Sequence, residues 1–258
     1  MGILEKMRLD GKSVFVTGGA RGLGYAMATA LAEAGASIMI ADLDLNSAKE
    51  AAKELSKISN KKMTAIGVDI SKPHEVNLMV EKMLSEYGKI DVAFCNAGIG
   101  KENRVEEDSY DEWKEVIEVN LNGTFLCAQA AGKVMIEQGH GSIILTASMS
   151  GHIVNIPQTE CSYAVSKAGV IKMAKNMAVE WAPHGIRVNS ISPGYMATEM
   201  TMNNKNLTPL IDKWLELTPL KRMGKPEDLQ SIAVYLAGDT SSFTTGADFI
   251  IDGGYTCI

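Results

Sequence analysis

The stretch Ser13-Val14-Phe15-Val16-Thr17-Gly18-Gly19-Ala20-Arg21-Gly22-Leu23-Gly24 decides the fold of this chain. Its first five residues form a short apolar run of the kind found in buried strands. The residues from Tyr25 to Ala34 have the composition of a helix, and Gly35 supplies a typical C-terminal cap. A strand, a glycine-rich turn and a helix in this order form the context of a dinucleotide-binding fingerprint.

The glycine-rich turn has the chemistry that a pyrophosphate needs. Glycines allow a tight turn, and the following helix offers free N–H groups and the positive end of its dipole to an anion. The spacing is Gly-x-x-x-Gly-x-Gly rather than GxGxxG, and such a loop alone is also compatible with a simple strand-to-helix turn. We expect nucleotide contacts from these residues of the turn: Gly18, Arg21, Gly22, Leu23 and Gly24.

A second apolar run, from Ser37 to Ala41, ends in Asp42. An acidic side chain about 20 residues beyond the glycines is the expected partner of the adenosine ribose hydroxyls, although polar residues also commonly end strands. Asp42 would repel a 2′-phosphate, which carries close to two negative charges (compare), whereas Arg21 would attract it. Because Leu43 and Asp44 add no positive charge beside Asp42, we predict NAD rather than NADP as the cofactor.

Strand and helix patterns alternate along the rest of the chain. The further expected strands are 63–68, 90–95, 142–147, 186–191 and 247–251, and the expected helices are 45–58, 73–87, 110–137, 163–181 and 226–236. This alternation predicts an α/β fold with a parallel sheet and crossover helices, in a single domain spanning 1–258. Ligands of such sheets collect at the carboxyl ends of the strands, where Gly18, Asp42, Asp69 and Asn96 are expected.

Two segments interrupt this regular pattern. Asn120-Leu121-Asn122-Gly123 is a run of poor helix formers inside a long helix, which predicts a local distortion of the kind that often marks a site. The segment 195–220 is polar and rich in methionine, and we expect it to be irregular. A loop of that length in a compact domain is usually a lid or a binding segment.

Composition narrows the classes of function. The net charge of −6 and the isoelectric point near 5.3 argue against a nucleic-acid partner. The cysteines Cys95, Cys127, Cys161 and Cys257 are widely spaced and form no metal-binding pattern, so we expect reduced thiols, no metal and a cytoplasmic location. The apolar runs are too short to span a membrane, and residues 1–11 have no apolar signal-peptide core.

Tyr163 and Lys167 are the strongest candidates for catalysis. Their spacing in Cys161-Ser162-Tyr163-Ala164-Val165-Ser166-Lys167 places both on one helix face, one turn apart. An ammonium group near a phenol favours the phenolate. At about 4 Å and an effective dielectric of roughly 20 the attraction is about 4 kcal/mol, so we expect the pKa of Tyr163 to fall toward neutrality. A tyrosine and a lysine at this spacing also occur by chance on many helices.

These residues together resemble the short-chain dehydrogenase/reductase family over nearly the whole chain. The resemblance rests on Thr17-Gly18-x-x-x-Gly22-x-Gly24, Asn96-Ala97-Gly98, Asn120, Ser148, Tyr163-x-x-x-Lys167 and Pro193-Gly194, all in family order. It implies a doubly wound, Rossmann-type sheet of seven parallel strands with helices on both faces, a nicotinamide cofactor and usually a homotetramer. The implied cofactor residues beyond the first turn are Asp42, Asp69, Ile70, Asn96, Ala97, Gly98, Tyr163, Lys167, Pro193, Gly194, Met196 and Thr198.

The resemblance also implies roles for four catalytic residues. Tyr163 is the general acid or base on the substrate oxygen, and Lys167 lowers its pKa and holds the nicotinamide ribose. Ser148 hydrogen-bonds the same substrate oxygen, and Asn120 positions a water that continues the proton path from Lys167. Taken singly, Ser148 would be a strand-end cap and Asn120 a buried amide bonded to backbone.

The loop Met149-Ser150-Gly151-His152-Ile153-Val154-Asn155 and the segment Ile191-Ser192-Pro193-Gly194-Tyr195 resemble the polyol and ketose branch, which includes mannitol, arabinitol and xylulose enzymes. We therefore expect NAD-dependent interconversion of a secondary alcohol and a ketone on a polyol or sugar acid. The expected substrate residues are Ser150, Asn155, Gln158 and Tyr195. For His152 and Gln158, a surface loop position is an equal alternative.

Other functions stay open. A carbonyl, hydroxysteroid or 3-oxoacyl reductase using NADP(H) is one alternative, although residues 201–205 are polar and no basic patch for an acidic carrier protein is evident. A non-catalytic nicotinamide-binding regulator is another, although such proteins typically lose the tyrosine or the lysine. We also expect a homo-oligomer, most simply a tetramer, because the helix after Tyr163 carries the apolar residues Val170, Met173, Ala174 and Met177 and few charges.

Overall fold

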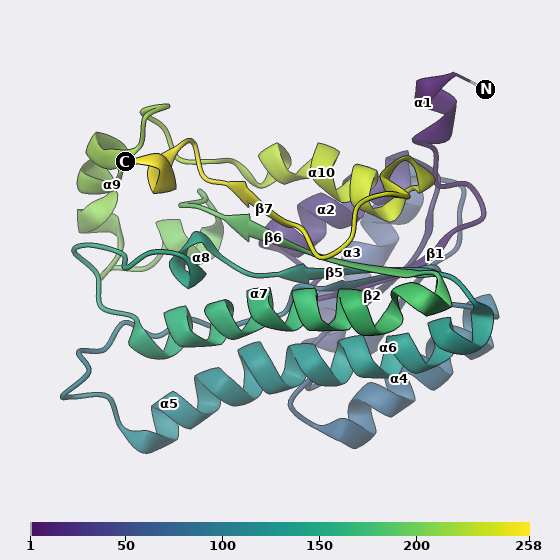
Figure 1. The fold of residues 1–258 in the computed structure, drawn as a ribbon, viewed down its shortest axis with the longest axis horizontal. Coiled ribbons are helices and arrows are strands. Elements are labelled where there is room, and N and C mark those ends of the chain that lie inside the picture. Colours follow the sequence, from purple (N-terminus) through teal and green to yellow (C-terminus); the bar gives the residue numbers. More distant parts are fainter. Residues whose placement is uncertain (1) are drawn as a thin grey trace.

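The computed structural model describes residues 2–258 and contains one parallel sheet of seven strands (Figure 1). The strand order is β3-β2-β1-β4-β5-β6-β7, so the chain runs outward from β1 first in one direction and then, from β4, in the other. The strands are β1 (Ser13–Thr17), β2 (Ser37–Asp42), β3 (Met63–Gly67), β4 (Val92–Cys95), β5 (Gly141–Thr146), β6 (Ile186–Pro193) and β7 (Asp248–Ile251). The predicted doubly wound α/β fold is confirmed.

Helices cover both faces of the sheet. One face carries α2 (Gly22–Glu33), α3 (Leu45–Ile58) and α10 (Gln230–Ala237), and the other carries α4 (Pro73–Tyr87), α5 (Tyr110–Ile117), α6 (Thr124–Gln138) and α7 (Cys161–Trp181). In β1 the side chain of Phe15 enters one core, whereas Val14 and Val16 enter the other. This follows from the period of two along a strand, and it explains why the central strands read as continuous apolar runs.

The distortion expected at Asn120 is present. Residues Glu118–Gly123 form a π-helical turn that joins α5 to α6. Ser109 begins this long helix with a capping box, in which its hydroxyl accepts a hydrogen bond from the N–H of Glu112. Gly139, in the left-handed conformation, ends it.

The segment 195–220 is more regular than expected. It contains α8 (Glu199–Met202), a 3₁₀ turn (Thr208–Leu210) and α9 (Ile211–Leu217). The ring of Trp214 is 1% exposed and stacks on Tyr195, with 4.0 Å between the ring centroids. The expectation of an irregular loop was wrong, because short helical turns form here and Trp214 of α9 packs on Tyr195. A short helix α1 (Ile3–Lys6), which the sequence reading did not predict, precedes β1.

Candidate active site

The glycine-rich turn follows β1 at the carboxyl edge of the sheet. Gly18 and Gly22 adopt positive φ angles of 60° and 57°, which only glycine takes up readily. A Cβ atom at Gly24 would overlap the Gly18 carbonyl oxygen and lie 2.6 Å from Nδ2 of Asn96. The backbone is therefore closely packed beneath the N-terminus of α2. A turn with this geometry fits the pyrophosphate of a dinucleotide, since its N–H groups and the helix dipole favour an anion.

Asp42 ends β2 beside this turn, as expected, but its carboxylate already has partners. Oδ2 accepts a hydrogen bond from the N–H of Ala20 at 3.1 Å, and Oδ1 accepts one from the N–H of Asp44 at 3.4 Å. The Arg21 side chain is exposed. The pKa of Asp44 is lowered chiefly by hydrogen bonds from Ser47 and Asn46, and the positive charge of Arg21 contributes in the same direction. Arg21 therefore lies near the end of β2, where the adenosine ribose is expected.

Asn96 joins three strand ends. Its Nδ2 donates to the carbonyls of Thr17 and Gly18 at 3.1 Å each, and its Oδ1 accepts from Thr146 Oγ1 at 3.2 Å. The amide of Asn96 therefore fixes the turn after β1 against β4 and β5.

Asp69 follows β3, and its carboxylate accepts hydrogen bonds from the N–H and the hydroxyl of Ser71 in the same loop.

The other expected cofactor residues lie at the same edge of the sheet. Pro193 ends β6 and pairs with Ile251 of β7, and Met196 is buried. Thr198 caps the N-terminus of α8, and its methyl group would lie 3.9 Å from a Cβ atom placed at Gly22. Ile70 is buried, and Ala97 and Gly98 follow Asn96.

Lys167 and Asn120 meet beneath this edge. Lys167 is 3% exposed, and its Nζ donates to the Thr146 carbonyl at 2.8 Å. Burial lowers the pKa of Lys167 to about 8. Oδ1 of Asn120 accepts from the N–H of Ile99 at 2.8 Å, while its Nδ2 donates to Ser166 Oγ at 3.1 Å. The π-helical turn thus presents Asn120 to the loop after β4 and to α7.

Tyr163 lies one turn before Lys167 on α7, as expected, with Nζ of Lys167 5.5 Å from the centroid of its ring. The expected lowering of its pKa was wrong for this structure. Burial raises the pKa of Tyr163 to about 12, the negative charge of Glu160 acts in the same direction, and a hydrogen bond with Ser148 only partly opposes them. The phenol is therefore held in its protonated form.

The four residues predicted to bind substrate lie together next to Tyr163. Ser148 Oγ donates to Ser150 Oγ at 3.1 Å. Asn155 Nδ2 donates to the Tyr195 hydroxyl at 2.8 Å, which in turn donates to Gln158 Oε1 at 2.9 Å. These bonds connect the loop after β5 to the segment after β6.

His152 does not join this group. Its Nε2 lies 2.7 Å from Oδ2 of Asp248. Asp248 also accepts hydrogen bonds from the hydroxyls of Ser190 and Ser192. His152 therefore attaches the loop after β5 to strands β6 and β7.

Two residues at the site, Trp214 and Glu160, were not predicted from the sequence. Trp214 donates from Nε1 to Gln158 Oε1 at 2.8 Å, and a tryptophan within a polar segment was the available signal. Glu160 precedes α7 and lies near Ser150 and Gln158. An acidic residue just before a helix is usually a favourable dipole contact, so its position three residues before Tyr163 did not indicate a site residue.

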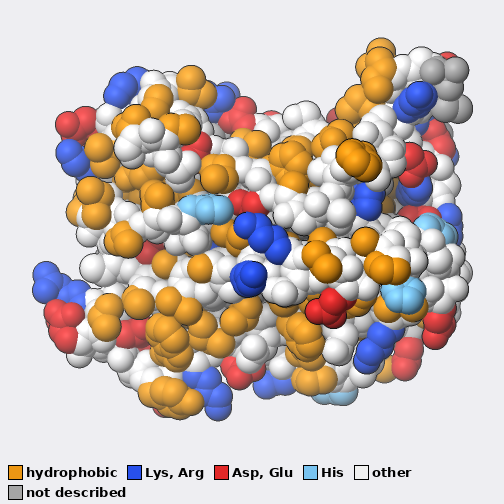
Figure 2. Space-filling model, viewed as in Figure 1, with side chains coloured by type: hydrophobic (Ala, Val, Ile, Leu, Met, Phe, Trp, Pro, Cys, Tyr) orange, Lys and Arg blue, Asp and Glu red, His pale blue; other side chains and the backbone are white. Residues whose placement is uncertain are grey.

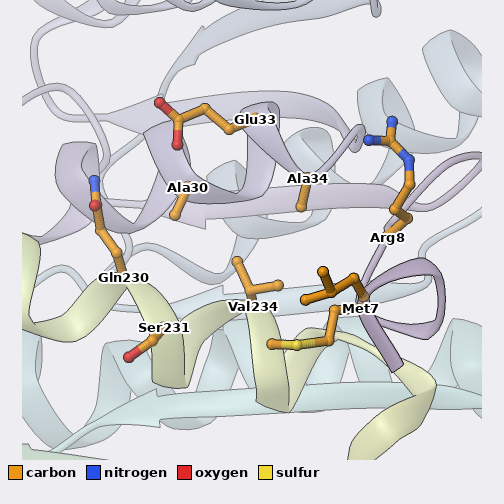
Figure 3. Close-up of a pocket in the computed structure, with 9 residues that line it drawn as sticks. Met7, Arg8, Ala30, Glu33, Ala34, Gln230, Ser231 and Val234 are labelled. Atoms are coloured by element: carbon orange, nitrogen blue, oxygen red, sulfur yellow. The ribbon is translucent and has the colours of Figure 1, made fainter. Parts of the chain in front are cut away.

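A hollow of about 360 Å³ lies elsewhere, between α1, α2 and α10 (Figure 3). Its middle is apolar, and it adjoins the C-terminal end of α2, away from the carboxyl ends of the strands. Within residues 2–258, no cluster of three His, Cys, Asp or Glu side chains could hold a metal ion. Over the same residues, no helix has the length and apolar character needed to cross a membrane.

The fold and site define a Rossmann-type dinucleotide-binding protein. A family model described as enoyl-(acyl carrier protein) reductase matches residues 18–256. An NADP-dependent mannitol dehydrogenase from Hypocrea jecorina is 42% identical, across 98% of this chain and 96% of that protein. A sorbose reductase from Schizosaccharomyces pombe is also 42% identical, across 96% of each. A short-chain type dehydrogenase/reductase from Mycobacterium marinum is 43% identical, with a TM-score of 0.96 and full coverage of both chains.

The chain therefore belongs to the short-chain dehydrogenase/reductase family. It is an oxidoreductase that interconverts an alcohol and a carbonyl group, and the resemblance to the polyol branch is confirmed.

The preference for NAD was wrong. The mannitol dehydrogenase from Hypocrea jecorina, which this chain resembles over nearly its whole length, is NADP-dependent, and this contradicts the prediction of NAD. The prediction relied on the position of Asp42 at the strand end facing the ribose, with no positive charge in the next two residues. In the structure the carboxylate of Asp42 accepts hydrogen bonds from backbone N–H groups, whereas Arg21 is exposed beside it. A guanidinium group is well suited to a phosphate.

Proposed function

We propose that this enzyme interconverts a sugar alcohol and the corresponding ketose with NADP(H). The observation that carries this proposal is the group of polar side chains next to Tyr163, formed by Ser150, Asn155, Gln158 and Tyr195. A polyol presents a hydroxyl on every carbon, so its site needs several hydrogen-bonding partners. A site of this kind also rejects analogues that lack the hydroxyls.

In the proposed reaction the protein orients the substrate against the nicotinamide and supplies or removes the proton on the substrate oxygen. The nicotinamide, when bound, carries the hydride. Tyr163 gives its phenolic proton to the carbonyl oxygen during reduction and takes it back during oxidation. The Ser148 hydroxyl donates a hydrogen bond to the same oxygen. Tyr163 is reprotonated by way of Lys167, which receives its proton from the water that Asn120 positions. The raised pKa of Tyr163 suits the acid role, because the phenol stays protonated when a ketone arrives.

We also propose that residues 195–220 form a lid over the substrate. The stacked rings of Tyr195 and Trp214 attach this segment to Gln158 through hydrogen bonds of 2.9 Å and 2.8 Å. At the other side, Asn204 Nδ2 lies 3.3 Å from both carboxylate oxygens of Glu102. Contacts on both sides of the site support a lid that closes as one unit.

A homotetramer is proposed on the exposed apolar residues found in two parts of the chain. Val170, Ala174 and Met177 are not among them, contrary to expectation, since they are buried in the core of the chain itself. Figure 2 shows apolar side chains over α5, α6 and α7, and the exposed residues there are Tyr110, Phe125, Val165 and Val179. Three further exposed apolar residues, Phe243, Ile250 and Ile258, lie in the last 16 residues of the sequence. Two kinds of interface are what a tetramer of dihedral symmetry requires.

A panel of substrates tests the proposed reaction. Purified protein would be given neutral ketoses with NADPH and NADH, polyols with NADP⁺ and NAD⁺, and a steroid ketone and an acyl thioester for comparison. We expect the highest kcat/KM with a ketose and NADPH. Preference for the steroid or the thioester would reject the polyol proposal and leave the family assignment intact.

A further inference from the structure

Two buried oxygen atoms next to Tyr163 have no hydrogen-bond partner. They are Oδ1 of Asn155, a residue that is only 4% exposed, and Oε1 of Glu160. Among the residues described, just one other buried side-chain polar atom, in Thr240, is unpaired. Buried polar groups are almost always paired, because an unpaired one destabilises the folded protein. Two such atoms in one site therefore point to a ligand that supplies the missing partners.

The two atoms belong to one continuous polar group. Hydrogen bonds from the side chains of Ser150 and Gln158 lower the pKa of Glu160, against the larger effect of burial, and the oxygen left without a partner is Oε1. Gln158 accepts a hydrogen bond from the Tyr195 hydroxyl, which accepts one from Nδ2 of Asn155. An amide oxygen and an ionised carboxylate can only accept hydrogen bonds. The missing partners are therefore donors, and the hydroxyl groups of a polyol or ketose are donors that this site can take.

The charge around Glu160 is negative. The carboxylate of Glu102 is near enough to raise the pKa of Glu160 further, after the larger effect of burial. The two basic residues nearest to Glu102 in the sequence are already paired with other carboxylates. Lys101 lies 2.7 Å from Glu115, and Arg104 lies 3.5 Å from Glu106. A substrate carboxylate at this position would thus be repelled by Glu160 and Glu102, and neither Lys101 nor Arg104 would be free to neutralise it.

We propose that Glu160 selects neutral polyols and ketoses over the corresponding sugar acids, and that Oδ1 of Asn155 accepts a hydrogen bond from a further substrate hydroxyl. This inference rests on the proposed function and narrows it, since the sequence alone left both polyols and sugar acids as candidate substrates. Glu160 is a substrate-binding residue here, because its carboxylate accepts from a hydroxyl that takes no part in the chemistry. The same carboxylate repels an acid group at that position.

L-Sorbose and 5-keto-D-gluconate test this selection, because they differ only in a CH₂OH group or a carboxylate at one end. We would measure kcat/KM for their reduction with NADPH in the wild type, in Glu160→Gln and in Glu106→Gln. The Glu106→Gln control removes an equal charge from an exposed residue. We expect the wild type to prefer L-sorbose. Glu160→Gln should raise kcat/KM for the keto acid about tenfold or more, mainly through KM, whereas Glu106→Gln should leave the preference unchanged.

The possible failures can be told apart. If the wild type neither reduces a neutral ketose nor oxidises a polyol, both the proposed function and this inference fall. If it reduces L-sorbose but Glu160→Gln keeps the same preference, or if the wild type prefers the keto acid, only the inference falls. Should Glu160→Gln fail to fold, Glu102→Gln must shift the preference in the same direction by a smaller factor. An unchanged preference in that variant overturns the inference.

Discussion

The imidazole of His152 and the carboxylate of Asp248 are joined at 2.7 Å, although 96 positions separate them in the sequence. Asp248 is a buried side chain that also accepts hydrogen bonds from Ser190 and Ser192. The loop that carries Ser148 is thereby attached to the strands that lead into Pro193 and Gly194. This contact holds the substrate loop and the end of β6 in one arrangement.

His152→Ala should therefore lower stability. The bond joins a partly exposed imidazole to a buried carboxylate. Losing such a hydrogen bond costs about 0.5–1.5 kcal/mol, and a chain of this length would lose a few degrees of Tm. Thermal unfolding followed by circular dichroism measures this. His184→Ala is the matched control, because His184 is exposed and away from this contact. Equal melting temperatures for the two variants would show that the His152 contact adds no stability.

Tyr163→Phe should abolish most turnover while cofactor binding persists. The substitution keeps the aromatic ring but removes the phenolic hydroxyl, which is the only proton donor proposed for the substrate oxygen. General acid–base groups contribute about 10²- to 10⁴-fold to rates, so we expect kcat to fall by such a factor. NADPH fluorescence gives binding and NADPH absorbance gives turnover. Turnover at the wild-type rate would reject Tyr163 as the acid.

Arg21→Ala should weaken NADPH binding selectively. A hydrogen bond to a charged group contributes about 1.5–3 kcal/mol, so KM for NADPH should rise by about ten- to a hundredfold while KM for NADH changes little. Lys49→Ala, which removes an exposed charge from the nearby helix α3, is the control. Equal effects on both cofactors would mean that Arg21 contacts the shared pyrophosphate rather than a 2′-phosphate.

The pH dependence of alcohol oxidation should respond to Glu160. Oxidation needs the phenolate of Tyr163, whose pKa is raised to about 12 by burial and by the charge of Glu160. The phenolate fraction therefore grows with pH throughout the neutral and mildly alkaline range, and kcat for oxidation should grow with it. Glu160→Gln lowers the pKa of Tyr163, so its kcat for oxidation should exceed that of the wild type at the same pH.

Ketone reduction provides the internal control for this prediction. It needs the neutral phenol, which prevails well below pH 12 in both proteins, so kcat for reduction should stay nearly constant from pH 6 to 9. A profile of oxidation that is unchanged in Glu160→Gln would show that Glu160 does not act on Tyr163.

Val179→Glu should disrupt the proposed tetramer. Val179 lies on α7 and is 78% exposed in the single chain, so an interface over this helix would bury the new charge. Light scattering should give a tetramer mass for the wild type and a smaller one for the variant. Leu78→Glu, on the exposed side of α4, should remain a tetramer. A wild-type monomer at micromolar concentration would reject the proposed assembly.

Local patterns were enough to predict the framework. The apolar run at 13–17, the glycines after it and the alternation of strands and helices determine a parallel sheet, because only such a sheet buries both faces of every central strand. The poor helix formers at 120–123 likewise predicted a distortion that the structure has as a π-helical turn. These features depend on neighbours in the chain, which a sequence displays directly.

Tertiary packing decided what the side chains can do. The sequence places Asp42 at the end of a strand, but only the fold turns its carboxylate to the backbone N–H of Ala20 and leaves Arg21 exposed. The sequence also places Lys167 one helical turn from Tyr163, and we expected the lysine to lower the pKa of the tyrosine. In the folded chain, burial and the charge of Glu160 raise that pKa instead. Hydrogen bonding and desolvation depend on atoms brought together from distant parts of the chain, and these contacts exist only in the folded protein.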